Sequence, residues 1–219
     1  MASSISAIGA ICPYDAKYGE VKVDVRDDSR GLSVKVETAR LRILSVCTEE
    51  YTPSLVALYG DKRVNALVGT GSTLDESAVH AKIKRWHSRW SDHNPLAGYV
   101  VVKRGTGEFV GQIILKPVKI RLEEGIDFVP ETIEIGFLSE EKHWKNGYGK
   151  EFTHAIVHHL VPDLISKGYS VKGRPIRNII ATARIDNDAS NSVLRSLMDY
   201  TGENPRYGGI RKWYSHVYK

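Results

Sequence analysis

Alternating apolar and polar positions near the start of the chain predict a β-hairpin. Valines alternate with polar residues over 21–25, and apolar residues alternate again over 32–36. Between them, Asp27-Asp-Ser-Arg-Gly31 has the composition of a tight turn. Because side chains on a strand alternate between two faces, both segments fit half-buried strands. The pattern continues over 38–44, whereas residues 1–20 read as irregular.

Two helices are predicted next. The first ends near residue 59 and begins either with Thr48 as its cap or one turn later at Pro53. Thr73 followed by Glu76 is a capping-box signature, and the helix behind it runs to about residue 90. The apolar face of this second helix contains Val79, Ile83 and Trp86.

Further strands follow these helices. Residues 98–103 and 109–116 are apolar and are joined by the glycine-containing turn 104–107, which predicts a hairpin. Residues 117–130 read as a long connection with some irregular strand. Another strand is predicted over 132–138.

The remaining chain alternates between helical and strand patterns. Helices are predicted over 151–165 and 188–198, with a buried strand at 179–183 and a closing strand at 212–218. The inward-facing residues are Phe152, Ala155, Ile156, Leu160 and Leu164 in the first helix, and Ala189, Val193, Leu194 and Leu197 in the second. The order of elements predicts an α+β fold, in which a mixed, mostly antiparallel sheet has helices on both faces.

The segment that ends the 132–138 strand carries the clearest chemical signal. Gly147 and Gly149 stand where the next helix begins, so backbone amides at that turn are open to a ligand. The helix dipole favours a phosphate there, and Lys145 and Lys150 add positive charge, which together suit a diphosphate-bearing cofactor. A tight strand–helix turn also explains two glycines without any ligand. The segment is neither a Walker A motif nor a Rossmann fingerprint.

This segment resembles the acetyl-CoA loop of the GNAT superfamily, whose pattern is Gln/Arg-x-x-Gly-x-Gly/Ala. Trp144-Lys-Asn-Gly-Tyr-Gly-Lys-Glu-Phe152 is similar to the RimJ/RimL-like subgroup, which often reads Trp-Gly-Lys-Gly-Tyr-Ala-Thr-Glu-Ala. Other blocks resemble that subgroup in the same order, namely 38–44, 55–61, 109–112, 134–137 and 187–190. The resemblance implies a GNAT acetyltransferase domain over 36–219, preceded by an extension, 1–35, that holds the hairpin. That extension could be an edge hairpin, a dimer arm or a pocket lid.

One departure concerns the acceptor side. The subgroup usually closes its last helix with Lys-Leu-Gly-Phe, where this chain has Ser196-Leu-Met-Asp-Tyr200. The resemblance therefore leaves the shape of the acceptor pocket open.

The resemblance also implies how the cofactor is held. In the family, two neighbouring parallel strands splay apart and the pantetheine arm lies between them; here these are 132–138 and 178–183. The backbone of Phe137 and Leu138 would hold the arm, and the amides of 145–150 would hold the pyrophosphate. The implied acetyl-CoA-binding residues are Phe137, Leu138, Trp144, Lys145, Asn146, Gly147, Tyr148, Gly149, Lys150 and Asn187.

Acetyl transfer to an amine needs a base for the amine and an acid for the departing thiolate. Glu134 is the candidate base, directly or through a water; otherwise it is a strand carboxylate that faces solvent or pairs with an arginine. Ser190 is the candidate acid; otherwise it only caps a helix. Asn187 is the expected cap of that helix, and its amide could also hold the pantetheine or the acetyl end.

Two further residue pairs receive a structural interpretation. His154 and His158 have the i, i+4 spacing of a metal site, but no third ligand is evident, so surface or packing roles and no metal are expected. Trp86 and Trp90 lie one helical turn apart and fit core packing, with a wall of the acceptor pocket as the alternative.

Composition limits the class of partner and compartment. The net charge of +5 is dispersed, which suits an anionic ligand but includes no polybasic block for nucleic acid. Cys12 and Cys47 make neither a disulfide framework nor a zinc site. No apolar run is long enough to span a membrane, and residues 1–13 lack the basic start of a signal peptide, so a cytoplasmic protein is expected.

The acceptor amine is the open question at this point. A protein or peptide N-terminus is the leading prediction, as in ribosomal-protein acetyltransferases. The alternatives are a polyamine or aminoglycoside, for which Glu123-Glu124-Asp127 could supply an acidic pocket, and a non-catalytic acyl-CoA-binding module. Both a monomer and a homodimer remain compatible with the sequence.

Overall fold

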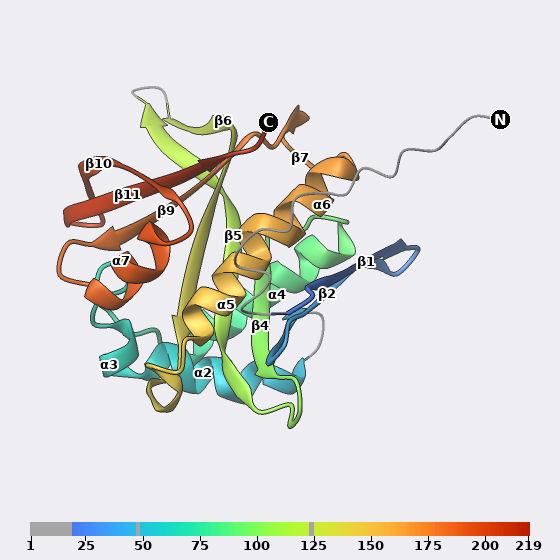
Figure 1. Cartoon of the computed structure of the whole chain (residues 1–219), viewed down its shortest axis with the longest axis horizontal. Helices are drawn as coiled ribbons and strands as arrows, with labels where there is room; N and C mark the ends of the chain where they lie inside the picture. The colour runs from blue at the N-terminus through green and yellow to red at the C-terminus, as the bar shows by residue number, and fades with distance from the viewer. Residues whose placement is uncertain (1–18, 47–48, 123–124) are drawn as a thin grey trace.

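A nine-stranded mixed sheet forms the centre of the computed structural model (Figure 1). The structure describes residues 19–46, 49–122 and 125–219, without the side chains of 120–127. Within these ranges the strand order is β1-β2-β3-β4-β5-β6-β9-β11-β10, and β7 and β8 form a separate small pair. The strands are β1 (Lys22–Asp28), β2 (Gly31–Glu37), β3 (Leu41–Ser45), β4 (Gly98–Lys103), β5 (Phe109–Leu122), β6 (Gly125–Ser139), β7 (Ser170–Val171), β8 (Arg174–Pro175), β9 (Asn178–Arg184), β10 (Asp199–Arg206) and β11 (Gly209–Val217).

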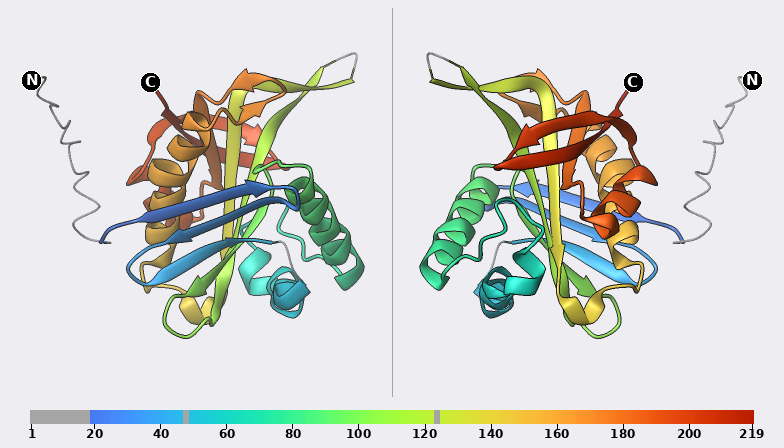
Figure 2. Two further views of the ribbon diagram at one scale, coloured as in Figure 1. Left: turned by 90° about the vertical axis from the view of Figure 1, so that its right-hand side faces the viewer. Right: turned by 90° about the vertical axis from the view of Figure 1, so that its left-hand side faces the viewer.

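Helices cover both faces of this sheet, which confirms the predicted α+β class (Figure 2). On one face lie α2 (Thr52–Gly60), α3 (Lys62–Asn65) and α4 (Glu76–Ser91). On the other lie α5 (Tyr148–Ala155), α6 (Val161–Ser166) and α7 (Asp188–Arg195). Short helical segments complete the list: η1 (Glu49–Tyr51), η2 (Glu141–His143) and η3 (Ile156–Leu160). No helix in the described ranges has both the length and the apolar content needed to cross a bilayer.

The predicted N-terminal hairpin is confirmed as β1 and β2, and it extends the central sheet. β2 pairs antiparallel with β3, and its alternate residues Leu32, Val34 and Val36 are buried in the main core. Asp27 ties the hairpin to distant segments: its carboxylate accepts a hydrogen bond from Tyr169 (2.8 Å) and contacts His93.

The connection predicted over 117–130 is wrong, because β5 and β6 run through it as one long antiparallel hairpin. Pairing continues from Gly111–Ser139 to Leu122–Gly125, with a register shift between Pro117 and Lys119. Proline cannot donate to a ladder, so a bulge at this position is expected. The sequence misled because Pro117 and the charges beyond it hide the strand pattern.

The structure shows where the two predicted helices near the start of the chain begin. Asp75, not Thr73, caps α4, since its side chain accepts from the Ala78 amide (2.8 Å). The helix α2 follows the second alternative, with Pro53 in its first turn. Thr48 lies outside the described residues, as do Cys12 and Cys47.

The C-terminal region contains one more strand than predicted. The helix α7 ends at Arg195, before the predicted end at 198, and β10 then begins at Asp199. β10 is almost entirely exposed and lacks apolar alternation, which explains why the pattern missed it. Ala189 is exposed and does not face the core as predicted, whereas Val193 is half-buried and packs against the core.

Trp86 and Trp90 confirm the prediction of core packing. They are 5% and 2% exposed, and Trp90 Nε1 donates to the carbonyl of Gly98 (3.3 Å). A Cβ at Gly98 would lie 2.4 Å from the Trp86 ring, so only glycine permits this contact. The pair therefore fixes α4 against β4.

The helix predicted from residue 151 begins at Tyr148 and contains a π-helical segment, η3, between α5 and α6. Pro162 lacks an amide hydrogen to donate to the carbonyl four residues earlier, a common cause of such a change in helical geometry. The predicted apolar stripe of this helix is fully buried.

Histidines gather along this helix and the last strand. The His158 ring lies 5.0 Å from the His154 ring and 4.9 Å from the His216 ring, measured between centroids. Burial, followed by the nearby His154 and His216, lowers the pKa of His158 from 6.5 to about 4. Among the described residues, no group of three His, Cys, Asp or Glu side chains is arranged to hold a metal ion.

We expect the free energy of unfolding to fall as the pH drops from 6.5 towards 4, in part because of His158. The unfolded chain binds a proton near pH 6.5 and the folded chain only near 4, so protons favour unfolding across this interval. Urea unfolding midpoints across this range should therefore depend less on pH in His158→Gln. His80→Gln, at an exposed position of α4, should keep the wild-type slope. Equal slopes in all three proteins would contradict the assignment.

Candidate functional site

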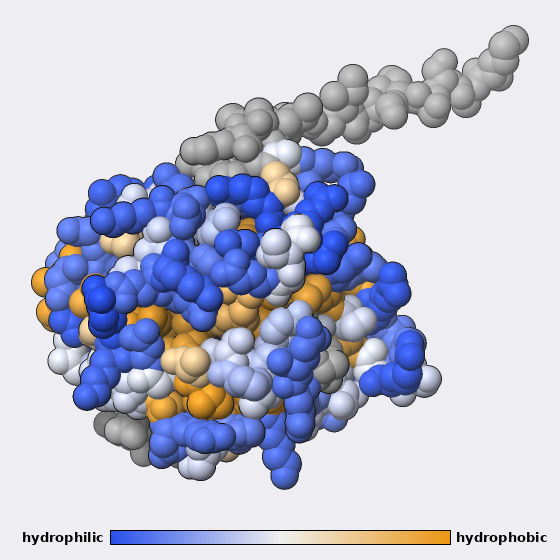
Figure 3. Space-filling view, turned by 90° about the horizontal axis from the view of Figure 1, so that it is seen from below, coloured by the Kyte–Doolittle hydropathy of each residue, from blue (hydrophilic) through white to orange (hydrophobic). Residues whose placement is uncertain are grey.

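A cleft of about 430 Å³ opens where the C-terminal end of β6 leaves β9. These two strands pair in parallel from Thr132–Asn178 to Glu134–Ile180 and then separate. Hydrophobic residues gather in a hollow of an otherwise polar surface when the molecule is seen from below (Figure 3). The walls are Arg63, Val64, Leu67 and Val68 around α3; Phe137, Leu138 and Ser139 of β6; residues 143–145, 147–150 and Phe152 around α5; and Asn187, Ala189, Ser190, Ser192 and Val193 of α7.

Most of the site residues predicted from the sequence meet in this cleft. Every predicted cofactor-binding residue except Asn146 lines it, and so does Ser190. Glu134 does not line it. The structure thus brings together residues from a strand, a loop and two helices. The most distant of the predicted residues that line the cleft, Phe137 and Ser190, are 53 positions apart in the sequence.

The start of α5 presents unpaired backbone amides to the cleft. Gly147 precedes the helix with φ 77°, and no side chain caps it. The first amide to bond along the helix is that of Glu151, which donates to the Gly147 carbonyl (3.2 Å). The amides of 148–150 come before it, where a helix has no internal acceptors to offer. Lys145, with φ 62°, and Lys150 stand beside them, so the turn favours an anion.

A buried carboxylate fixes the first turn of α5. Glu151 is fully buried and accepts hydrogen bonds from Thr38 Oγ1 (2.6 Å), Arg40 N (3.0 Å) and Arg40 Nε (2.6 Å). Arg40 Nη1 in turn donates to the Asn146 carbonyl (3.0 Å). Asn146 therefore serves the cleft by anchoring the loop, with its carbonyl directed to Arg40.

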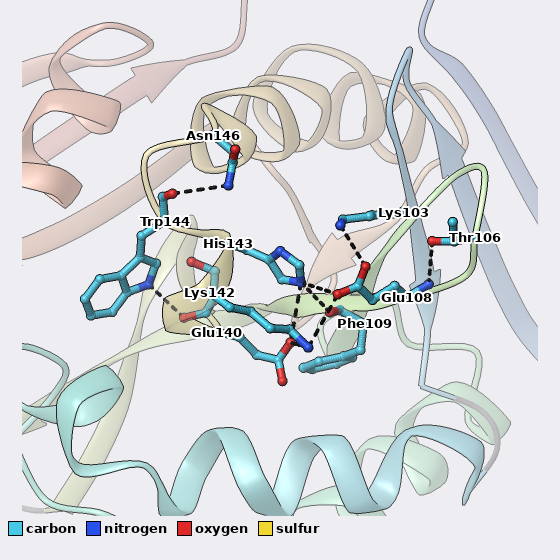
Figure 4. A network of polar contacts seen from close by, with 10 residues as sticks. Lys103, Thr106, Glu108, Phe109, Glu140, Lys142, His143, Trp144 and Asn146 are labelled. Carbon is cyan, nitrogen blue, oxygen red and sulfur yellow. Dashed lines mark hydrogen bonds and ion pairs between the residues drawn. The ribbon is translucent and has the colours of Figure 1, made fainter.

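A polar network holds the loop before α5 against β5 (Figure 4). His143 is 5% exposed, and its Nε2 donates to the Phe109 carbonyl (3.0 Å) and lies 3.2 Å from Glu108. Trp144 Nε1 donates to the Ser139 carbonyl (3.0 Å). A hydrogen bond to Glu140 raises the pKa of Lys142. These contacts position the cleft wall without occupying the helix start.

The start of α7 forms the opposite wall. Asn187 caps this helix as predicted, because its side chain accepts from the Ser190 amide (3.0 Å). The Ser190 side chain is half-buried and lines the cleft. Ser190 therefore borders the space that a ligand in the cleft would fill.

Glu134 lies deeper, at the last paired position of β6 and β9. It is 4% exposed, and its Oε2 contacts both Arg206 Nη2 (2.6 Å) and Lys116 Nζ (3.2 Å). The pairing of Glu134 with an arginine, which was the alternative to a role as base, is therefore present. Both cations contact the same oxygen, and within the described ranges Oε1 makes no hydrogen bond or ion pair.

The sequence did not predict that α3 lines the cleft or that Arg40 holds the loop beside it. The helix α3 has only four residues, too short for any periodic pattern, although Asp61 caps it with bonds to the amides of Arg63 and Val64. An aspartate before a short polar run was its one local signal. Of the acidic loop considered for the acceptor, Glu123 and Glu124 lie outside the described residues, and so does the Asp127 side chain.

The comparisons with known proteins agree with this geometry. The model of the family described as acetyltransferase (GNAT) domain matches residues 40–197. No curated protein sequence matches the chain. The hairpin formed by β1 and β2 precedes the matched residues.

Solved acetyltransferases share the fold. A GNAT-family acetyltransferase from Bacillus anthracis is 18% identical, with a TM-score of 0.62 over 84% of this chain and 98% of that one. RimL, a ribosomal L7/L12 alpha-N-protein acetyltransferase solved with coenzyme A, is 16% identical, with a TM-score of 0.59 over 81% and 94%. The microcin C7 self-immunity acetyltransferase MccE, solved with acetyl-CoA and AMP, is 15% identical, with a TM-score of 0.58 over 82% and 93%. At these identities the likeness is one of fold.

Proposed function

The chain belongs to the GNAT acetyltransferase family, and from this premise we propose that it moves the acetyl group of acetyl-CoA to a primary amine, the N-terminus of a protein or peptide. The proposal rests on one observation, the cleft that joins the open amides of α5, the free end of β6 and the start of α7. RimL, which shares the fold, is an alpha-N-protein acetyltransferase, and this supports the choice of acceptor. We further propose that the protein acts in the cytoplasm.

Each part of the cleft suits one part of the cofactor. The amides of 148–150, with Lys145 and Lys150, would hold the diphosphate. The backbone of Phe137 and Leu138 would pair with the pantetheine arm, because β6 has lost β9 as a partner at this point. Asn187 and Ser190 would then stand near the thioester.

The reaction itself needs two proton transfers. The amine nitrogen forms a bond to the carbonyl carbon, the carbon–sulfur bond breaks, and the sulfur leaves with the electron pair. We propose that Glu134 Oε1 takes the proton of the amine through a water, and that the Ser190 hydroxyl protonates the sulfur. Arg206 and Lys116 keep the carboxylate in place through its other oxygen.

We expect Ser190→Ala to lower kcat about 100-fold, with little change in the affinity for CoA, because a positioned acid contributes about that factor or more. Glu134→Gln should lower kcat/KM similarly. Thiol release from acetyl-CoA with a set of peptides and small amines measures both effects. Ser192→Ala, at another residue of the same wall, is the matched control. Full activity in either Ser190→Ala or Glu134→Gln would remove that residue from the mechanism.

The same assay tests the function. Acetylation of peptide N-termini, with no turnover of polyamines or aminoglycosides, is the expected outcome. Binding of acetyl-CoA without turnover of any amine would contradict the proposed activity.

A further inference from the structure

Positive charge is concentrated around Glu134 on the side of the sheet that faces away from α5. Lys116 and Arg206 both contact its carboxylate, and Arg211 of β11 lies close by. Lys82 of α4 is also near, since burial and then the charges of Arg85 and Lys116 lower its pKa. Among the described side chains, Lys116 and Arg206 thus contact this carboxylate, Arg211 interacts with it and with Asp186 from a greater distance, and Lys82 adds a fourth positive charge beside Lys116. This arrangement repels a cationic acceptor and favours an anionic one.

Arg211 has no direct ion pair with a carboxylate within the described part of the chain. It is 4% exposed, its guanidinium donates to the Gly69 carbonyl, and its Nε has no hydrogen-bond partner there. Burial lowers its pKa. A buried guanidinium without a direct ion pair is costly, and a bound carboxylate in contact with it would relieve that cost.

Arg206 and Trp213 offer further unused donors. Arg206 Nη1 and Trp213 Nε1 are buried without a partner in the described ranges. Both residues line a second cavity of about 410 Å³, whose other residues include Lys119, Thr132 and Ile180. The Arg206 Cζ lies 5.1 Å from the centre of the Trp213 ring, so the two donors stand together. A cavity with two donors and excess positive charge suits a carboxylate.

Tyr207 connects the two arginines at the tip of the β10–β11 hairpin. Its ring centre lies 4.9 Å from Arg206 Cζ and 5.1 Å from Arg211 Cζ, and the residue is 41% exposed. Arg211 lies on the side of this cluster towards the first cleft, because Gly69, whose carbonyl it contacts, directly follows the cleft residue Val68. An anion held here would thus lie beside the inner wall of the cofactor cleft.

We propose that the acceptor carries a carboxylate near its amine, and that this carboxylate binds Arg206 and Trp213 in the second cavity, with Arg211 adding charge. The inference rests on the acetyltransferase function proposed above and narrows its acceptor to acidic amines. A peptide that begins with an acidic residue and a small amino acid share this chemistry. The proposal excludes polyamines and aminoglycosides, which would place positive charge against four cations.

Matched acceptors test this proposal by thiol release from acetyl-CoA. One arm compares a peptide amide that begins with aspartate with its asparagine counterpart, and the other compares β-alanine with β-alaninamide. We expect kcat/KM to be about tenfold higher for the acidic member, a typical value for hydrogen bonds to a charged group. The arm with the larger preference distinguishes a peptide from a free amino acid.

Variants then locate the carboxylate. Arg211→Gln and Trp213→Phe should each reduce kcat/KM for the acidic member about tenfold, mainly through KM, and change the neutral member by less than twofold. Arg211→Lys keeps the charge and should recover part of the loss. Arg26→Gln, which removes one charge from exposed β1, should match wild type.

A binding measurement separates this inference from the proposed function. Calorimetry with the N-acetylated aspartate peptide, added to the protein with CoA, should show binding that weakens about tenfold in Arg211→Gln. Acetylation of amines without preference for the acidic member overturns the inference and leaves the function in place. Binding of the acidic product without any turnover supports the anion site and overturns the function. If the protein neither binds the acidic product nor acetylates any amine, both the inference and the proposed function are overturned.

Discussion

Replacing Gly149 with aspartate is expected to weaken CoA binding about a thousandfold while the protein stays folded. The proposed diphosphate lies on the amides of 148–150, so a carboxylate there faces it at close range. Two unit charges 4 Å apart repel by about 4 kcal/mol at an effective dielectric constant of 20, which corresponds to about three powers of ten in Kd.

Neither a steric clash nor a less stable helix would account for this loss of CoA affinity. A Cβ at Gly149 would lie 3.5 Å from Val193 Cγ2, an ordinary contact. An acidic residue in the first turn of a helix is favourable, so the substitution should not destabilise α5. Calorimetry with CoA measures the effect. Gly149→Asn is the neutral control of equal size and should bind far more tightly than the aspartate variant. Equal affinity in the two variants would place the diphosphate elsewhere.

Glu151→Gln should lower the free energy of unfolding by about 3 kcal/mol, near the lower end for a broken buried ion pair. The carboxylate now accepts hydrogen bonds from Thr38 and Arg40. Glutamine has the same shape, but its amide NH₂ group would face these donors and could not accept from them. The Arg40 side chain is 45% exposed, and water therefore compensates part of its loss.

Urea unfolding measures this change as a lower midpoint with an unchanged slope. Glu20→Gln, at a side chain 78% exposed, should match wild type. CoA affinity should also fall in Glu151→Gln, because Arg40 holds the Asn146 carbonyl in the loop beside the cleft. A midpoint within experimental error of wild type would mean that Glu151 does not stabilise this turn.

Local patterns predicted much of the fold and of the cleft wall formed by the starts of α5 and α7. The turn at Gly147 has φ 77°, which favours glycine, and the Asn187 cap uses a hydrogen bond across three residues. The strand β4 has the bounds that its apolar run predicted. Such features depend on a few neighbouring residues, so they can be read from the chain itself.

Patterns failed where the partner is distant or the strand is exposed. β10 carries few buried residues, so no alternation marked it. The bulge near Pro117 interrupted the pattern of β5, although its pairing with β6 continues to Leu122. In both cases the neighbouring strand, and not the local sequence, determines the structure.

The sequence alone determined the α+β class, the family and the position of the glycine turn before α5, because each depends on periodicity or on neighbouring residues. Only the tertiary structure decided what surrounds Glu134 and Glu151. Their arginine partners are 72 and 111 positions away along the chain. Periodicity tells which side of a strand is buried, and it carries no information about which charged group from another strand will lie against that side.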